Sequence, residues 1–330
     1  MKSPVAEAVD RGDLDELVLL VDGLCSAREW ASVIELRDRC RHALERGLQL
    51  WPAAEYSEYR LALEAPPDFA GPVVTEQAGR FALGPLWEVV ASTHDWASLS
   101  PYLPSGPARS LVAQERVLRG EDLTRDDSVD TDVLDVPLVL LSWEPSYPVA
   151  TYRSSKAEFP SPPPEPLRRM TLGDAGPEVE SEGVDALLAV GLPWQEQSNG
   201  AAAAVAVNGS AAEAIAALVH VPVDAVALPG AAAIAWLAWA GASGGAYGRR
   251  RGAPLGRFAA WWALAAIAGL DWPPDPGEME HELHRLEWHR WESAGITHGW
   301  SACVAITDPR RGMSWALHAV DDHREDQPAT

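Results

Sequence analysis

Positive charge is concentrated in one glycine-rich stretch of the chain. The stretch Gly241–Arg257 reads GASGGAYGRRRGAPLGR and contains Arg249, Arg250, Arg251 and Arg257 among six glycines. Guanidinium groups bind phosphate and carboxylate groups through paired hydrogen bonds. Backbone N–H groups at the start of a following helix would strengthen the attraction for an anion. The spacing therefore predicts that these four arginines bind an anionic ligand or an acidic partner surface.

A structural interpretation of the same arginines stays open. Cations that follow the C-terminus of a helix interact favourably with its dipole, which would account for Arg249–Arg251. Arg257 falls in the first turn of the next expected helix, where a cation opposes the dipole by about 0.3–1 kcal/mol. A bound anion would reverse that cost. The anion could be a ligand, an acidic partner, the chain's own segment 121–135, or other internal carboxylates that neutralise the arginines.

The histidines offer weaker candidates. His298 and His318 lie on or near an expected terminal hairpin and are auxiliary candidates for proton transfer. The segment EMEHELHRLEWHRWE holds His281, His284 and His289 among many glutamates. Helical His and Glu at this spacing can ligate a metal only with a matching second helix, and the sequence supplies none. We expect a solvated charged helix face there, and we predict neither a metal site nor a cofactor.

The overall composition limits the partners. The chain has 330 residues and a formal net charge of −22, which argues against general binding of nucleic acid or anionic membranes. The N-terminal segment lacks the apolar core of a signal peptide. Its three cysteines are too few for a disulfide framework, and we predict reduced thiols in the cytoplasm. The uncharged run 225–248 is interrupted by Pro229 and glycines, so we expect it to be buried in the protein and not in a membrane.

The first part of the chain is expected to be helical. Ser3-Pro4 and Asp13 are N-cap signals, and Glu16 completes a capping box with Asp13. Short helices separated by brief breaks predict an α-solenoid-like domain over residues 1–122, followed by an acidic linker over 123–136. The longer helical segments are expected near residues 28–46, 53–64, 73–82, 86–92 and 107–119.

The remainder, residues 137–330, is expected to form an α+β domain with a Pro-rich excursion at about 154–185. We predict a small, mainly antiparallel sheet packed with Ala/Trp-rich helices. Tryptophan pairs three residues apart, Trp236/Trp239 and Trp288/Trp291, would each share a helix face and serve packing. The expected strands are 135–143, 201–207, 223–228 and a hairpin of 300–306 with 313–319; the expected helices are 211–219, 230–242, 254–269 and 275–292.

Two motifs resemble a known group of proteins. The stretch GRRRGAPLGRFAAWWALAAIAGLDWP (248–273), together with AQERVLRGEDL (113–123), resembles an uncharacterised family of actinobacterial proteins of similar length. The family is known only as a domain of unknown function. The resemblance implies an actinobacterial, cytoplasmic protein, and it brings no activity, cofactor or catalytic residue.

Two functions are compatible with these features. In the first, the protein is an interaction or regulatory module whose arginine loop binds another protein or a small anionic ligand. In the second, it is an enzyme that acts on a phosphorylated or carboxylated small molecule, with the arginines as a clamp and His298 or His318 as the proton carrier. An enzyme needs the arginines and a histidine in one concave pocket, whereas a binding module needs only an accessible patch.

Overall fold

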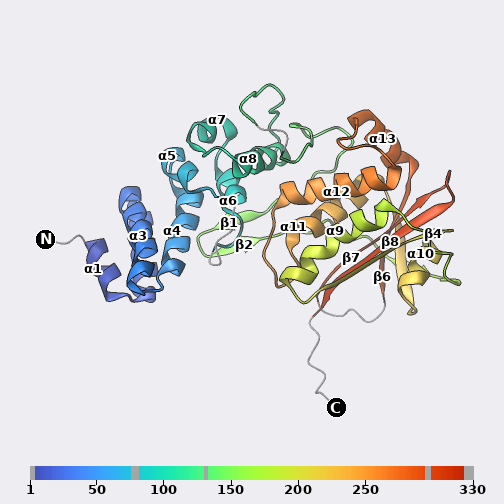
Figure 1. Ribbon diagram of the computed structural model, residues 1–330, viewed down its shortest axis with the longest axis horizontal. Helices are drawn as coiled ribbons and strands as arrows, with labels where there is room; N and C mark the ends of the chain where they lie inside the picture. Colours follow the sequence, from blue (N-terminus) through green and yellow to red (C-terminus); the bar gives the residue numbers. More distant parts are fainter. Residues whose placement is uncertain (1–3, 76–81, 130–132, 294–298, 323–330) are drawn as a thin grey trace, which may run out of the picture. The chain divides into compact units, whose positions relative to one another are not determined.

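The computed structural model describes residues 4–75, 82–129, 133–293 and 299–322 (Figure 1). The chain forms two compact units. One comprises Met1–Val133 and Ala150–Phe159, and the other comprises Leu134–Val149 and Pro160–Thr330. No helix in the described ranges is both long and apolar enough to cross a membrane. The domain boundaries predicted from the sequence stay a prediction.

The first unit is a succession of short helices with one small hairpin (Figure 1). Neighbouring helices pack against each other, with α3 on α4, α4 on α6 and α6 on α8. Of the helix expected over 73–82, Val74 and Thr75 are not helical, and 76–81 lie outside the described residues. In order the elements are α1 (Pro4–Arg11), α2 (Leu14–Ala27), α3 (Trp30–His42), η1 (Ala43–Arg46), α4 (Trp51–Glu64), α5 (Pro67–Ala70), η2 (Gly71–Val73), α6 (Leu86–Thr93), α7 (Trp96–Leu99), η3 (Ser100–Tyr102), α8 (Pro107–Leu118), β1 (Thr151–Arg153) and β2 (Lys156–Glu158).

The cap predicted at Asp13 is confirmed. Its carboxylate accepts hydrogen bonds from the backbone N–H groups of Asp15 and Glu16, which satisfies donors that helix α2 leaves free. The reciprocal bond of a capping box is absent among the described contacts of Glu16, because that side chain pairs with Arg11 instead. The cap Ser3 lies outside the described residues.

The described residues of the second unit form a six-stranded antiparallel sheet with the order β3-β5-β6-β7-β8-β4. Helices α9 and α11 pack on one face, α12 packs on those two helices, and α10 covers part of the other face (Figure 1). The α+β fold is thus confirmed. The elements are β3 (Arg168–Met170), α9 (Glu182–Gln197), β4 (Ala201–Asn208), α10 (Ala211–Leu218), β5 (Val223–Leu228), α11 (Gly230–Ser243), α12 (Ala253–Ala268), α13 (Pro276–Arg285), β6 (Glu287–Ser293), β7 (Gly299–Asp308) and β8 (Met313–Asp322).

Patterns among neighbouring residues correctly predicted most helices and strands of the second unit. Ser210 and Glu213 form a reciprocal capping box at the start of α10. The alternating residues near the C-terminus form the expected hairpin, in which β7 pairs with β8 in register. The backbone N–H of Gly312 closes the turn onto the carbonyl of Asp308.

Two predicted elements were wrong. The helix expected over 275–292 ends at Arg285, and Glu287–Ser293 is strand β6 between β5 and β7. Because side chains alternate along a strand, Trp288 and Trp291 point to opposite faces of the sheet and do not share a helix face. The strand expected over 135–143 is also not formed, and that segment is irregular. Its backbone carbonyls instead bind an arginine side chain, as described below.

Candidate functional site: the arginine loop

The predicted arginine loop connects α11 to α12 and is held in place by backbone contacts. The Asp321 carboxylate accepts from the Ala246 N–H at 2.5 Å and from the Ser198 hydroxyl at 2.6 Å. The Tyr247 N–H donates to the Ser198 hydroxyl. At the far end, the Arg251 N–H donates to the carbonyl of Ala242 at 2.8 Å. These contacts fix the loop to both β8 and α11, so its side chains project from a defined backbone.

Glycine is required where the two helices and the loop approach closely. A Cβ at Gly244, where φ is +72°, would lie 1.9 Å from the carbonyl oxygen of Arg249. A Cβ at Gly256 would lie 2.1 Å from the carbonyl oxygen of Ala238. Both distances are below any real contact, so the glycines in the stretch allow α12 to pack against α11 and the loop to fold back.

Arg257 differs from the expectation for an anion-binding residue. Its side chain is 0 % exposed and forms a two-pronged ion pair with Glu144, with Nε at 2.8 Å and Nη2 at 2.6 Å from the carboxylate oxygens. The guanidinium also donates to the carbonyls of Pro137 at 2.8 Å and Val139 at 3.1 Å. An external anion cannot reach it. Arg257 is therefore removed from the candidate ligand-binding residues, and its counter-ion is internal.

Glu144 is the centre of this buried cluster. It also accepts from the Tyr147 hydroxyl at 2.7 Å, the Trp261 indole at 3.0 Å and the Leu141 N–H at 3.1 Å. Burial by itself would raise the pKa of Glu144, but the hydrogen bonds and charge of Arg257 outweigh it and leave the pKa below its ordinary value. The cluster holds the irregular segment 134–149 against α12, which explains why that segment is not a strand.

The three adjacent arginines differ in exposure. Arg249 is exposed, Arg250 is buried at 7 % exposure, and Arg251 is half-buried. Burial lowers the pKa of Arg251, and the charge of Glu196 acts in the opposite direction. In the described part of the chain, no side chain forms an ion pair or hydrogen bond with the Arg251 guanidinium. Arg251 is thus a partly desolvated cation without a direct counter-ion, directly before the first turn of α12.

The auxiliary histidines are not assembled with the arginines. His318 lies on the face of β8 that packs toward α10, where it stacks on Trp291 with ring centroids 5.2 Å apart. Burial lowers the pKa of His318. Asp321, which anchors the arginine loop, is three residues further along β8 and points to the opposite face. His298 lies outside the described residues.

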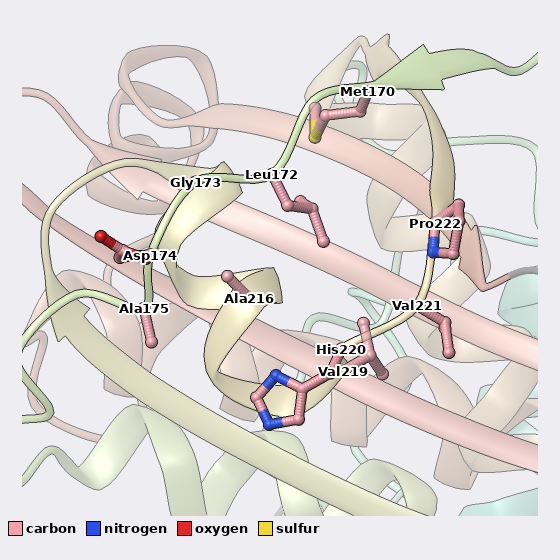
Figure 2. A pocket seen from close by; sticks show the side chains of 10 residues that line it. All are labelled: Met170, Leu172, Gly173, Asp174, Ala175, Ala216, Val219, His220, Val221 and Pro222. Atoms are coloured by element: carbon pink, nitrogen blue, oxygen red, sulfur yellow. The ribbon is translucent and has the colours of Figure 1, made fainter.

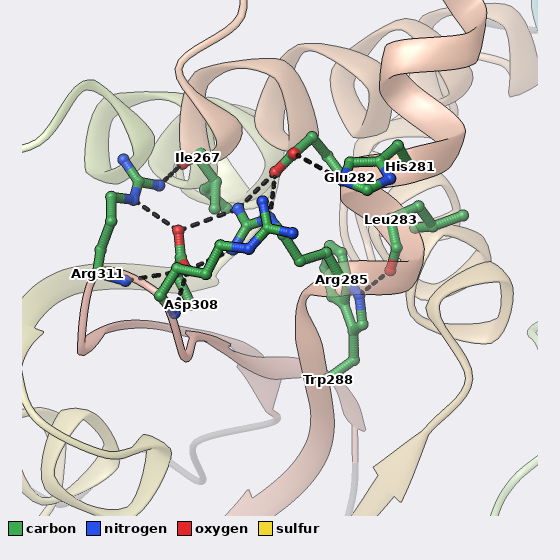
Figure 3. Close-up of polar contacts among 9 residues, drawn as sticks. Ile267, His281, Glu282, Leu283, Arg285, Trp288, Asp308 and Arg311 are labelled. Atoms are coloured by element: carbon green, nitrogen blue, oxygen red, sulfur yellow. Dashed lines mark hydrogen bonds and ion pairs between the residues drawn. The ribbon is translucent and has the colours of Figure 1, made fainter.

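The Glu/His-rich segment contributes Glu282 and Arg285 to an ion-pair network (Figure 3). Buried Asp308 accepts hydrogen bonds from Arg285 and Arg311, and Glu282 pairs with the same Arg285. Burial would raise the pKa of Asp308, yet these bonds hold it well below its usual range. No group of His, Cys, Asp and Glu within the described residues could hold a metal ion.

A pocket of about 510 Å³ lies beside the C-terminal end of α10 (Figure 2). Its lining is mostly apolar and includes Met170, Leu172 and Val219. Its two titratable side chains, Asp174 and His220, are both exposed at its margin (Figure 2). The pocket is on the α10 side of the sheet, so it is not part of the arginine loop.

Sequence reasoning located the loop but missed its anchors. Glu144, Asp321 and Ser198 were not singled out. One signal was available for Glu144: it is the only charged residue in 136–149, and Arg257 is the only charged residue in 253–268. A single acid and a single base, each within an apolar segment, are expected to pair when both segments are buried. Asp321 and Ser198 carry no comparable signal.

The fold and the loop thus define an α+β protein with a helical first unit and a basic helix–helix connection. A family model described as a family of unknown function, DUF6183, matches residues 7–323. The chain therefore belongs to that family, and the resemblance to a domain of unknown function is confirmed. No curated protein and no solved structure matches the chain.

Proposed function

We propose that this protein is an interaction module whose arginine loop binds a carboxylate or phosphate group, carried by a partner protein or by a small ligand. The single observation that carries the proposal is the state of Arg251. Its guanidinium is partly removed from water and has no ion-pair partner among the described residues. A desolvated charge without a counter-ion costs free energy, and an anion bound there would recover part of it.

Two further features support an anion at this position. Arg249 is exposed on the same loop, two residues away, and can contribute a second guanidinium. The first turn of α12 follows directly, and its N-cap residue Gly252 provides no side-chain cap. The partial positive charge of a helix N-terminus favours a nearby anion.

The enzymatic alternative has less support. It requires the arginines and a proton carrier in one pocket, and His318 lies on the opposite face of the sheet. We also propose the cytoplasm as the location, because Cys25, Cys40 and Cys303 are buried free thiols.

The test is a titration of the full chain with inorganic phosphate and with a phosphoserine peptide, followed by calorimetry and thermal unfolding at constant ionic strength. A ligand at a hundredfold its Kd stabilises a protein by about 2.7 kcal/mol. We expect Arg249→Gln/Arg251→Gln to weaken binding at least tenfold while leaving unfolding without ligand nearly unchanged.

The matched control is Arg310→Gln, which removes an exposed charge from the β7–β8 turn. This control also corrects for the general stabilisation that phosphate gives by exclusion from protein surfaces. Binding of inorganic phosphate would indicate a small-ligand site. Binding of the phosphoserine peptide without binding of phosphate would indicate a protein partner. Equal responses of the wild type and the loop variant to both probes would reject the proposal.

A further inference from the structure

Strand β4 is an edge of the six-stranded sheet, and only part of that edge is covered (Figure 1). The segment before α9 pairs with the C-terminal half of β4. The Val179 N–H donates to the carbonyl of Ala206, and the Asn208 N–H donates to the carbonyl of Pro177, both at 2.9 Å. That segment then leaves the strand to enter α9. The N-terminal half, Ala201–Ala204, is not covered by any described strand.

Backbone alternation identifies which groups are open. Ala206 and Asn208 direct their N–H and C=O groups away from β8, because they bond the outer segment. Residues two apart on a strand point the same way, so Ala202 and Ala204 also direct theirs outward. The carbonyl of Ala202 accepts from the side chain of Gln195. No described residue bonds the outward N–H or C=O of Ala204.

Residues 201–204 of this edge carry no charged side chain, proline or bulge of their own. Natural proteins protect edges with charged side chains, prolines or bulges. Residues 201–204 are four alanines, and they pair with β8 in regular register. The outward N–H and C=O groups of Ala204 can therefore pair with one more strand.

A pocket of about 480 Å³ lies where the outer segment separates from β4, between residues 178–185 and Ala204–Ala206. Four carboxylates line it, and all four residues are exposed. Within the described ranges, none of them forms an ion pair. The start of α9 adds partial positive charge, but a helix terminus carries only about half an elementary charge. The pocket therefore favours basic side chains. Its acidic residues are Glu178, Glu180, Glu182 and Asp185.

We propose that the edge of β4 binds an extended, Lys- or Arg-containing segment of a partner protein as an added strand. The open N–H and C=O groups at Ala204 supply backbone pairing, and alternate basic side chains of the segment reach the carboxylates. A second copy of this chain is a poorer occupant, because its net charge of −22 would be repelled. The proposal is independent of the arginine loop.

The test uses the full chain and a labelled peptide of alternating lysine and valine, followed by fluorescence anisotropy. We expect binding that weakens with added salt, and none for the same peptide with glutamate in place of lysine. Two further peptides carry N-methyl groups on either the lysines or the valines. Only one set of alternate N–H groups pairs with an edge, so only one of these peptides should lose binding.

Variants of the chain complete the design. Ala204→Pro removes the outward N–H without breaking the bonds to β8, because a proline is tolerated on an edge strand whose N–H faces outward. We expect affinity for the lysine peptide to fall at least tenfold. Glu178→Gln/Glu180→Gln should lower the affinity for the lysine peptide several-fold at low salt. The control is Glu165→Gln/Asp174→Asn, which neutralises two exposed acids elsewhere.

Three results would overturn the proposal. The first is the absence of peptide binding, which would mean that the carboxylates only protect the edge. The second is equal loss, or no loss, with both N-methylated peptides, a readout that does not depend on whether Ala204→Pro folds. The third is a concentration-dependent dimer in sedimentation that Ala204→Pro abolishes, which would assign the edge to a second copy of the chain.

Discussion

Arg251 and Arg257 are six residues apart in one motif, but their surroundings differ. Arg257 is completely buried, and Glu144 and two backbone carbonyls satisfy its guanidinium. Arg251 is half-buried and has no such partner among the described residues. The difference shows that a cluster of arginines in a sequence can combine two kinds of site. A closed site is buried and paired within the protein, whereas an open site is partly exposed and has no such partner.

The closed type of site recurs elsewhere in the same unit. Asp308 joins Arg285 of α13 to Arg311 after β7, and Arg311 also donates to the carbonyl of Ile267 in α12. In both closed sites, one buried carboxylate holds segments that are distant in sequence. A buried charge is tolerated because it is paired and hydrogen-bonded.

The largest expected loss of stability comes from removing the arginine of the closed site. Arg257→Met leaves the Glu144 carboxylate buried without its counter-ion, and we expect the free energy of unfolding in urea to fall by about 3–5 kcal/mol. Arg251→Met should change it by less than about 1 kcal/mol, because no ion pair is lost. Equal losses for the two variants would remove the distinction between the two arginines.

The same comparison can be sharpened with a double variant. Glu144→Leu/Arg257→Met removes both charges together, so no unpaired charge stays buried. We expect this variant to be more stable than the sum of the two single changes predicts, by more than about 1 kcal/mol. Additive losses would mean that the pair does not act as a unit.

An intermediate effect is expected at Asp308. Asp308→Asn removes the charge that Arg285 and Arg311 share, and we expect a loss of about 1–3 kcal/mol at pH 7. Because the folded state lowers the pKa of Asp308, the unfolded chain binds this proton more readily. Its stabilising contribution is therefore present above pH of about 4 and is lost as the pH falls through the folded pKa.

Urea unfolding measured as a function of pH checks this prediction. The wild type should lose stability below pH of about 4 more steeply than Asp308→Asn does. Arg310→Gln on the same turn is the control, since its exposed side chain has no contact with Asp308 among those described. Parallel pH curves for the wild type and Asp308→Asn would contradict the assignment.

The smallest effect is expected at His318. Burial lowers the pKa of this imidazole, so the unfolded chain protonates it first as the pH falls below about 6.5. The stabilising contribution of neutral His318 should therefore be fully present above pH of about 6.5, and it should be lost as the pH falls from that value through the folded pKa. His318→Gln should flatten this decline, whereas His281→Gln, on the exposed face of α13, should not. A two-dimensional NMR titration of the His318 ring provides the direct measurement, and a pKa above 6.5 would contradict it.

The sequence predicted the elements whose signals are local. The alternation in 300–306 and 313–319 and the cap at Ser210 depend only on neighbouring residues, and both are confirmed. Strand β6 was missed because its charged residues continue the pattern of α13, and only pairing with β5 and β7 decides its conformation. The segment 135–143 was misjudged because its carbonyls bind Arg257 and not another strand.

The sequence was enough to locate the arginine loop, but it did not distinguish the roles of the individual arginines or identify the residues that anchor the loop. Glycines and arginines indicated a basic connection between two helices, which is what the structure shows. The role of Arg257 depends on Glu144, which is 113 residues away. The anchoring of the loop depends on Asp321 and Ser198, which are 123 residues apart. Contacts of this kind are set by the tertiary fold, and no local pattern predicts them.

The distance between Glu144 and Arg257 along the chain also constrains biosynthesis. At elongation rates of about 5–20 residues per second, Arg257 is added roughly 6–23 s after Glu144. Throughout that interval the nascent polypeptide carries an apolar segment, 134–149, whose docking helix has not yet been translated. A ribosome that stalls between these two codons would leave that segment without its cover, and such a product is a natural substrate for chaperones or proteases.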